Sequence, residues 1–288
     1  MATAQLVPGA ARGEPRARRR ISLRLGVAIG VVIVYVLVAT FGPFITHFNS
    51  IETNVLDRLL PPGGHGPVPG VHWLGTDWLG RDMVGEIIQG ARISLEIGAA
   101  TIGLSLGFGT LVGIVAGFSG GLTDSTLMRI ADIQLAFPSI ILAIFIAAAL
   151  GSSVLNVVIA LSLASWVIFA RIARAETIAI KHKAYVEASR LLGAGRIRIM
   201  RCAILPSTLR SLSIYATVQF GFVIVAEAAL SFLGVGVPAS DTSWGTTIFG
   251  GESYLSSAWW ISTLPGIALA VLVVCMSIIG DELSERLS

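Results

Sequence analysis

The stretch Tyr185–Pro206 reads YVEASRLLGAGRIRIMRCAILP and joins two long apolar runs of this 288-residue chain. Four of its residues are arginine and one is glutamate, so the stretch is basic. On either side, residues 133–170 and 211–226 hold no Asp, Glu, Lys or Arg. A basic segment between two such runs is typical of a cytoplasmic loop in a membrane protein.

The composition also places the chain in a membrane. It is 54% hydrophobic and only 13% charged, and its mean hydropathy is +0.82. A soluble domain of this size could not bury so much apolar surface, so the bilayer must act as solvent. A spanning helix needs about 20 apolar residues, and the uncharged run 133–170 would be about 57 Å long as one helix, nearly twice a bilayer core. It must therefore turn back, and Gly151–Ser153 is the natural turn.

We expect an all-α polytopic membrane protein with six transmembrane helices, at about 25–45, 94–118, 127–150, 154–173, 212–235 and 261–280. Residues 1–20 predict a disordered basic cytoplasmic tail, and residues 21–288 one transmembrane domain. The external segment 46–92 contains a Pro/Gly-rich middle, 60–69, that predicts no regular structure. Residues 82–95 predict a separate amphipathic helix at the outer surface. Pro138 predicts a kink or a helix start.

The positive charges predict the orientation. With both termini cytoplasmic, all but Arg58, Arg81 and Arg92 of the 20 lysines and arginines lie inside. A cleaved signal peptide is the alternative for the start of the chain, but residues 25–45 are too long for one and no small-x-small site follows. The pI near 9.2 therefore reflects topology, and no nucleic-acid partner is expected.

Motifs for covalent or metal chemistry are missing from the sequence. There is no GxxxxGK[ST] loop, so we expect no ATP bound by this chain, and no HExxH, CxxC or GxSxG occurs. The histidines are scattered over loops and share no helix face: His47, His65, His72 and His182. Cys202 and Cys275 imply neither a disulfide nor a zinc site. The sequence thus predicts a non-catalytic protein without a metal or cofactor of its own.

Residues 185–206 themselves predict two short helices. Tyr185, Ala188 and Leu192 fall on one helix face, and Lys183 and Glu187 are i, i+4 partners. The glycines at 193–195 then break the helix, and a second short helix over 196–202 is expected to end at Pro206. Such a knob could enter a groove of another subunit, or it could lie on the membrane with its arginines on anionic lipid. The residues alone do not favour either of these alternatives.

The spacing of Glu187-Ala188-Ser189, Gly193 and Leu205-Pro206 resembles the EAA loop of bacterial ABC-importer permeases, which docks on an ATPase subunit. Ser189 replaces the second alanine of that signature, and Ala203 stands where isoleucine is common. The resemblance favours the docking alternative. It implies that the ATPase-coupling residues are Tyr185, Glu187, Ala188, Ser189, Leu192, Gly193, Leu205 and Pro206.

Further blocks are similar to the C-type permease of dipeptide and oligopeptide importers. HWLGTDWLGRD at 72–82 with GARISL at 90–95 resembles the external signature of that family, and LSFLGVG at 230–236 with SWG at 243–245 resembles its fifth helix and following loop. The chain departs from the family at Ser277 and in the tail after Asp281. The resemblance implies an external, binding-protein side formed by Thr76, Asp77, Gly80, Arg81 and Asp82.

Glu227 interrupts what is otherwise one uncharged predicted span, 212–235. A carboxylate there costs about 2.5–3.5 kcal/mol on insertion scales, so it should face protein or water. It is either a pathway-lining group that touches a peptide ammonium or a hydrogen-bonded structural group. The second interpretation is favoured, because a pore for peptides must tolerate many side chains.

The resemblance implies a permease subunit of a type I ABC importer in the bacterial inner or plasma membrane, forming half of a pathway for short peptides. Implied partners are a second, related permease in a heterodimer, two ATPase subunits that hold ATP and Mg²⁺, and an extracytoplasmic peptide-binding protein. ATPase closure would move the helix at 187–193 and rock the spans between two states. Nickel complexes or glutathione remain open as substrates. The alternatives are a self-contained ion-driven carrier or channel, for which one intramembrane charge is unusually few, and an inert anchor, which leaves the EAA spacing unexplained.

Overall fold

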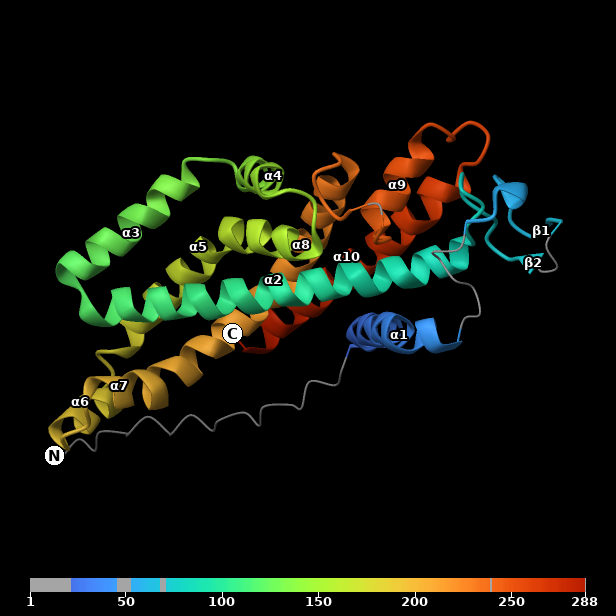
Figure 1. Ribbon diagram of the computed structural model, residues 1–288. Helices are drawn as coiled ribbons and strands as arrows, with labels where there is room; N and C mark the ends of the chain where they lie inside the picture. Colours follow the sequence, from blue (N-terminus) through green and yellow to red (C-terminus); the bar gives the residue numbers. More distant parts are fainter. Residues whose placement is uncertain (1–21, 46–52, 68–70, 239, 288) are drawn as a thin grey trace, which may run out of the picture.

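The computed structural model describes residues 22–45, 53–67, 71–238 and 240–287. The tail predicted for 1–20 and His47 lie outside these residues. Within them the chain is almost entirely helical, as predicted (Figure 1). Among the described residues, five helices are long and apolar enough to span a membrane, and a sixth span results if one bent pair is counted, which agrees with the predicted six.

The spans and their bounds are α1 Leu23–Ile45, α2 Met83–Ser119, the bent pair α3 Gly121–Leu135 and α4 Ser139–Leu150, α5 Val154–Ile180, α8 Leu205–Phe232 and α10 Trp260–Leu287. Short elements join them: a 3₁₀ turn Val55–Asp57, strands β1 Gly64–His65 and β2 Val71–His72, α6 Ala184–Leu191, α7 Arg196–Ile199, a π-helical turn Met200–Ile204 and α9 Trp244–Glu252. The strands pair antiparallel, so the prediction of no regular structure in 60–69 was wrong at residues 64–65.

Helix α2 corrects the predicted boundary on the outer side. The amphipathic helix expected over 82–95 and the second span form one helix of 37 residues, about 55 Å long. The carboxylate of Asp82 caps its first turn by accepting hydrogen bonds from the backbone N–H groups of Val84 and Gly85. No proline interrupts the helix after this cap, so it continues to the inner turn at Gly120-Gly121.

The third predicted span is bent rather than continuous. Its two halves, α3 and α4, meet at 86° at a break that contains Pro138, which confirms the predicted kink. The turn predicted at 151–153 is also confirmed, because α4 ends at Leu150 and the Ser153 side chain caps α5. Figure 1 shows α3 and α4 arching above α5.

Pro206 does not end a helix. Helix α7, the π-helical turn and α8 follow one another without a loop, so the short helix predicted over 196–202 is the start of a longer helical run. Pro206 lies inside this run, and because proline has no backbone N–H, the hydrogen-bond ladder is interrupted there, directly after the π-helical turn Met200–Ile204. The outer loop after α8 holds the unpredicted α9, which begins with a capping box formed by Ser243 and Thr246.

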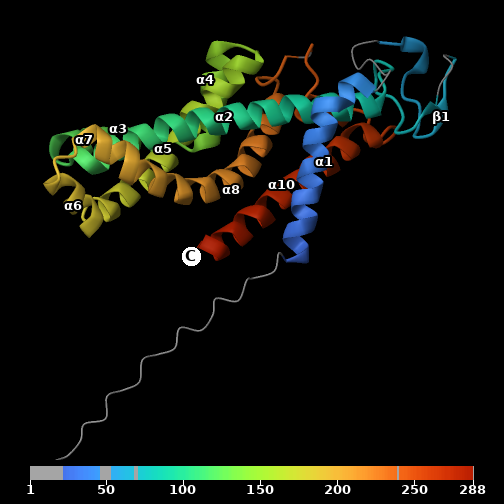
Figure 2. The ribbon, with the colours of Figure 1, turned by 90° about the horizontal axis from the view of Figure 1, so that it is seen from below.

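Helices α2 and α5 pack closely through a stripe of glycines. A Cβ added at Gly109, Gly113 or Gly117 would lie within 3 Å of α5, against Trp166 O, Ala170 O and Arg174 O respectively. Small residues at four-residue spacing allow two helix backbones to approach in this way. Figure 2 shows α1 and α10 crossing the molecule below this pair.

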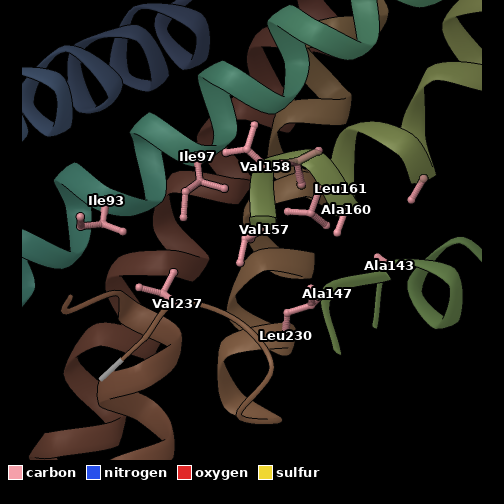
Figure 3. Close-up of a cluster of buried hydrophobic side chains, with 12 residues drawn as sticks. Ile93, Ile97, Ala143, Ala147, Val157, Val158, Ala160, Leu161, Leu230 and Val237 are labelled. Carbon is pink, nitrogen blue, oxygen red and sulfur yellow. The ribbon is translucent and has the colours of Figure 1, made fainter. Parts of the chain in front are cut away.

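The main apolar core lies where α2, α4, α5 and α8 meet. Figure 3 shows Ile97 of α2 facing Val157 and Leu161 of α5, with Ala147 of α4 and Leu230 of α8 beside them. These side chains are 0–2% exposed. The bundle is therefore centred on α5. Helices α6 and α7 lie near one end of α2, and strands β1 and β2 lie near the other end (Figure 1).

Candidate functional site

The inner knob, residues 184–204, has a buried root and an exposed tip. Val186, Ile199 and Ile204 are 0–3% exposed and pack against Ile180 of α5 and Ile114 of α2. This contact fixes the knob to the end of the closely packed α2–α5 pair. A displacement of the knob would therefore be carried into two spans.

Gly193 closes α6 in a left-handed conformation, with φ of +83°. Its N–H donates to Arg190 O, and the N–H of Ala194 donates to Ser189 O, both at 3.0 Å. These are the two hydrogen bonds of a Schellman motif, which favours glycine at this position. The break predicted from the sequence is confirmed.

The tip of the knob presents large apolar side chains to the surroundings. Leu191 and Leu192 are 89% and 88% exposed, Ile197 is 71% exposed and Tyr185 is 48% exposed. Beside them Tyr185, Ser189, Ala194, Arg198, Cys202 and Pro206 are among the residues that line a hollow of about 410 Å³. Exposed apolar groups of this kind mark a surface that another molecule covers.

The predicted coupling residues divide between this surface and the helix itself. Glu187, Ala188 and Pro206 are exposed, whereas Leu205 is half-buried. The Ser189 hydroxyl donates to Tyr185 O within the helix. No ion pair joins Lys183 to Glu187 in the described part of the chain, so the predicted pairing across one turn is wrong and the Glu187 carboxylate is left to the surface.

At the other end, residues 53–67 and 71–82 form an outer cap, and several of its charged groups pair internally. The Asp77 carboxylate accepts hydrogen bonds from the backbone N–H groups of Leu79 and Arg81, each at 2.8 Å. The Arg81 guanidinium lies 2.7 Å from Asp77 and 2.8 Å from Glu86. The predicted external residues Thr76 and Asp77 are thus fully buried, and they shape the outer surface from beneath it.

Two further contacts tie the cap to the helices. His72 Nδ1 lies 2.8 Å from Asp82 Oδ2, and the Trp260 indole donates to Thr76 O at 3.0 Å. At Gly80 a Cβ would lie 1.8 Å from Asn54 O, so only glycine fits there. The signature residues of 76–82 therefore hold a fixed cap above α2.

Glu227 lies inside the chain in this conformation. It is 0% exposed, and its carboxylate accepts hydrogen bonds from the hydroxyls of Ser94 and Ser231, both at 2.9 Å. Ser231 in turn accepts from the N–H of Val237 at 3.1 Å. The network joins α2, α8 and the outer loop, and it supports the structural interpretation of this acid.

The structure brings the distant signature blocks together. Trp244 of the 243–245 block is fully buried and donates to Ile87 O at 3.1 Å. A Cβ at Gly90 would lie 2.6 Å from the Trp244 indole, so this ring packs directly against the backbone at the start of the 90–95 block. Sequence reasoning missed Glu86, a buried acid in the first turn of α2, because it predicted α2 to be two separate helices.

Metal-binding groups do not assemble among the described residues: no set of three or more His, Cys, Asp or Glu side chains there could hold an ion. Cys202 is exposed and Cys275 is buried, and both are free thiols. In the parts described, the chain offers surfaces and an interior bundle, and no metal centre is assembled there.

Comparison with known proteins agrees with this arrangement. The family model described as "Binding-protein-dependent transport system inner membrane component" matches residues 109–288. A dipeptide transport system permease protein of Alkalihalophilus pseudofirmus is 37% identical over 88% of this chain and 81% of its own length. A di/tripeptide transport system permease protein of Pseudomonas aeruginosa is 38% identical over 88% of this chain and 83% of its own length.

The fold is also found in a solved transporter. An inward-facing structure of the MetNI methionine ABC transporter covers 72% of this chain and 98% of the matched chain, with a TM-score of 0.58 and 19% sequence identity. At that identity the likeness concerns the fold.

Proposed function

Because this chain belongs to the family of binding-protein-dependent transport system inner membrane components, we propose that it is the permease subunit that forms half of a peptide pathway in an ATP-driven importer. The curated relatives that support a peptide substrate carry dipeptide or di/tripeptide transport in their names. The chain is a multi-pass membrane protein, and we assign it no chemical step of its own.

The inner knob is the observation that carries this proposal. Its apolar tip, with Leu191 and Leu192 almost fully exposed, is joined through buried Val186 to the α2–α5 pair. This geometry suits a helix held in the groove of an ATPase subunit that binds ATP and Mg²⁺. ATP-driven closure of two such subunits would move the knob and, through α5, the bundle.

The remaining partners are a second, related permease and an extracytoplasmic peptide-binding protein above the outer cap. The ion-driven carrier considered from the sequence is disfavoured by the family and by the two most buried acids of the spans, since Glu86 pairs with Arg81 and Glu227 is hydrogen-bonded. Neither is held ready as an ion site in this conformation.

Co-purification tests the proposal. The chain is co-expressed with its candidate ATPase subunits, second permease and binding protein, and uptake of radiolabelled trialanine is measured in proteoliposomes. We expect uptake that needs ATP, and loss of both ATPase association and uptake in the double variant Leu191→Ser, Leu192→Ser. The control variant Leu122→Ser alters an 87%-exposed leucine at the start of α3 and should keep both.

Three results would count against the proposal. ATP hydrolysis by the purified chain alone would contradict the need for a motor subunit. An importer that carries no peptide would contradict the substrate class. A double variant that keeps its ATPase subunits but loses binding to anionic vesicles would assign the knob to the lipid surface.

A further inference from the structure

A hollow of about 200 Å³ opens on one side of the bundle between α4, α5 and α8. We refer to it as the mid hollow. No residue of its lining carries a charge, and its polar residues are Ser139, Ser165 and Gln219, one from each helix. Its volume equals that of about seven water molecules at about 30 Å³ each, enough for the end of a peptide.

The mid hollow lies about half-way across the membrane. Ser165 is the twelfth residue of α5, about 17 Å below its outer end, and Gln219 is the fifteenth of α8, about 21 Å above its inner start. The apolar layer of a bilayer is about 30 Å thick. Hydrogen-bonding groups at this depth have no lipid partner, so they must meet protein, water or cargo.

The polar groups of the mid hollow still have unused hydrogen-bonding capacity. Ser165 is 8% exposed, and its hydroxyl has no partner among the described residues. Gln219 uses its oxygen to accept from the Tyr215 hydroxyl at 3.0 Å, but its amide N–H groups have no acceptor within the described chain. By contrast, Gln134 donates to Leu163 O and accepts from Trp166 Nε1, so both ends of that amide are used.

The start of α4 adds backbone donors to the same place. Pro138 offers no side-chain cap, and the first backbone bond of the helix runs from Leu142 N to Pro138 O at 3.0 Å. The N–H groups of residues 139–141 therefore have no acceptor in the described structure. The 86° bend between α3 and α4 brings this 12-residue helix's N-terminus, with its partial positive charge, to mid-membrane.

We propose that the mid hollow binds the carboxylate end of a peptide as it crosses the membrane. Ser165 and Gln219 donate hydrogen bonds to the carboxylate, and the N-terminus of α4 with Ser139 provides further donors. The inference rests on the proposed function and adds which end of the peptide this chain contacts. Since the donors are neutral, the site can bind the anion and still release it.

Photolabelling tests this site in the whole importer. The complex with its partner subunits is placed in nanodiscs without ATP and is exposed to Ala–photoleucine–Ala, either as the free acid or as the C-terminal amide. Hydrogen bonds to a charged group are strong enough that we expect about tenfold more label on this chain from the acid. The double variant Ser165→Ala, Gln219→Leu should lower acid labelling to the amide level.

Ser162→Ala is the matched control, because Ser162 lies on the same helix and its hydroxyl already donates to Thr101 O at 3.4 Å. It should label as the wild type does. Equal labelling by acid and amide in the wild type would overturn the inference. Loss of the second permease from the purified double variant would also overturn it, by showing that these side chains bond to that subunit. Absence of any peptide uptake by the wild-type importer would instead overturn the proposed function.

Discussion

At the scale of single residues, substitution can separate a structural role of Glu227 from a role in transport. Glu227→Gln keeps the shape and can still bond to Ser94 and Ser231, so we expect uptake and thermal stability close to those of the wild type. Glu227→Leu leaves two buried hydroxyls without an acceptor, at a cost of about 1–3 kcal/mol each. Thermal unfolding of the purified protein should show a lower midpoint for the leucine variant.

Glu96→Leu controls for the loss of a carboxylate from a helix. Glu96 is 56% exposed and pairs with Arg92 on the surface of α2, where such a pair contributes little. Its unfolding midpoint should not move. A selective loss of free-amine peptide uptake in Glu227→Gln, with N-acetylated peptides unaffected, would instead show that this acid contacts the cargo.

Glu187 and Gly193 test coupling at the knob. Glu187→Lys reverses an exposed charge, and Gly193→Asp forces a side chain into the left-handed conformation at about 1–2 kcal/mol, too little to unfold the bundle. Loss of an interfacial charge pair can cost about 2–5 kcal/mol of association. Both variants should insert normally but lose ATPase association and peptide uptake.

Glu252→Lys supplies the charge-reversal control, because Glu252 is exposed at the end of α9, far from the knob. It should retain ATPase subunits. Wild-type uptake in both knob variants at normal expression would show that this loop does not couple.

The sequence predicted the residues of the outer cap but not the direction in which they face. Arg81 and Asp77 were predicted as an external surface, and the structure pairs them with each other and with Glu86. The tight position of Gly80 depends on Asn54, and the cap contact of Thr76 depends on Trp260, which is 184 positions away. Partners so distant in the chain cannot be read from a local pattern.

At the scale of elements, the closest helix contact follows from a pattern in the sequence. Gly109, Gly113 and Gly117 recur every four residues, which is the signal for close packing in membranes, and they meet α5. Gly113→Ala would place a Cβ 2.2 Å from Ala170 O, so α5 must move outward. We expect a lower unfolding midpoint and weaker coupling of ATPase activity to peptide uptake.

Gly103→Ala is the matched control on the same helix. A Cβ there meets nothing within 4 Å, and alanine favours a helix over glycine by about 1 kcal/mol. Its midpoint should stay or rise. If both substitutions shift stability alike, the glycine stripe does not govern the contact between α2 and α5.

The presence of each span was easier to predict than the residues at which it begins and ends. Apolar runs and glycine turns revealed all six spans, because burial in lipid imposes their length. The boundary of α2 was wrong because the helix expected over 82–95 continues into the second span, and that of α8 was wrong because the helical run continues through Pro206. Helix α9 was not predicted, because its nine residues are too few to show a periodic pattern.

At the scale of the whole molecule, the charge distribution and the fold support one topology. The knob and the outer cap lie at opposite ends of α2, which is about 55 Å long and exceeds a bilayer core of about 30 Å. The start of α1 and the end of α10 lie on the same side, since the Ser22 hydroxyl donates to the Glu282 carboxylate. A chain that crosses the membrane six times has the start of its first span and the end of its last span on the same side.

Labelling from one side of the membrane tests the orientation. His65 and Lys183 are exposed, one in the outer cap and one beside the knob, so each is replaced by cysteine in a Cys202→Ser, Cys275→Ala background. An impermeant maleimide should label position 65 in intact cells and position 183 only after permeabilisation, because the excess of arginines at the knob end keeps that end inside. The parent without cysteines controls for background labelling. Labelling of position 183 but not of position 65 in intact cells would invert the molecule, and it would place the knob where no cytoplasmic ATPase could reach it.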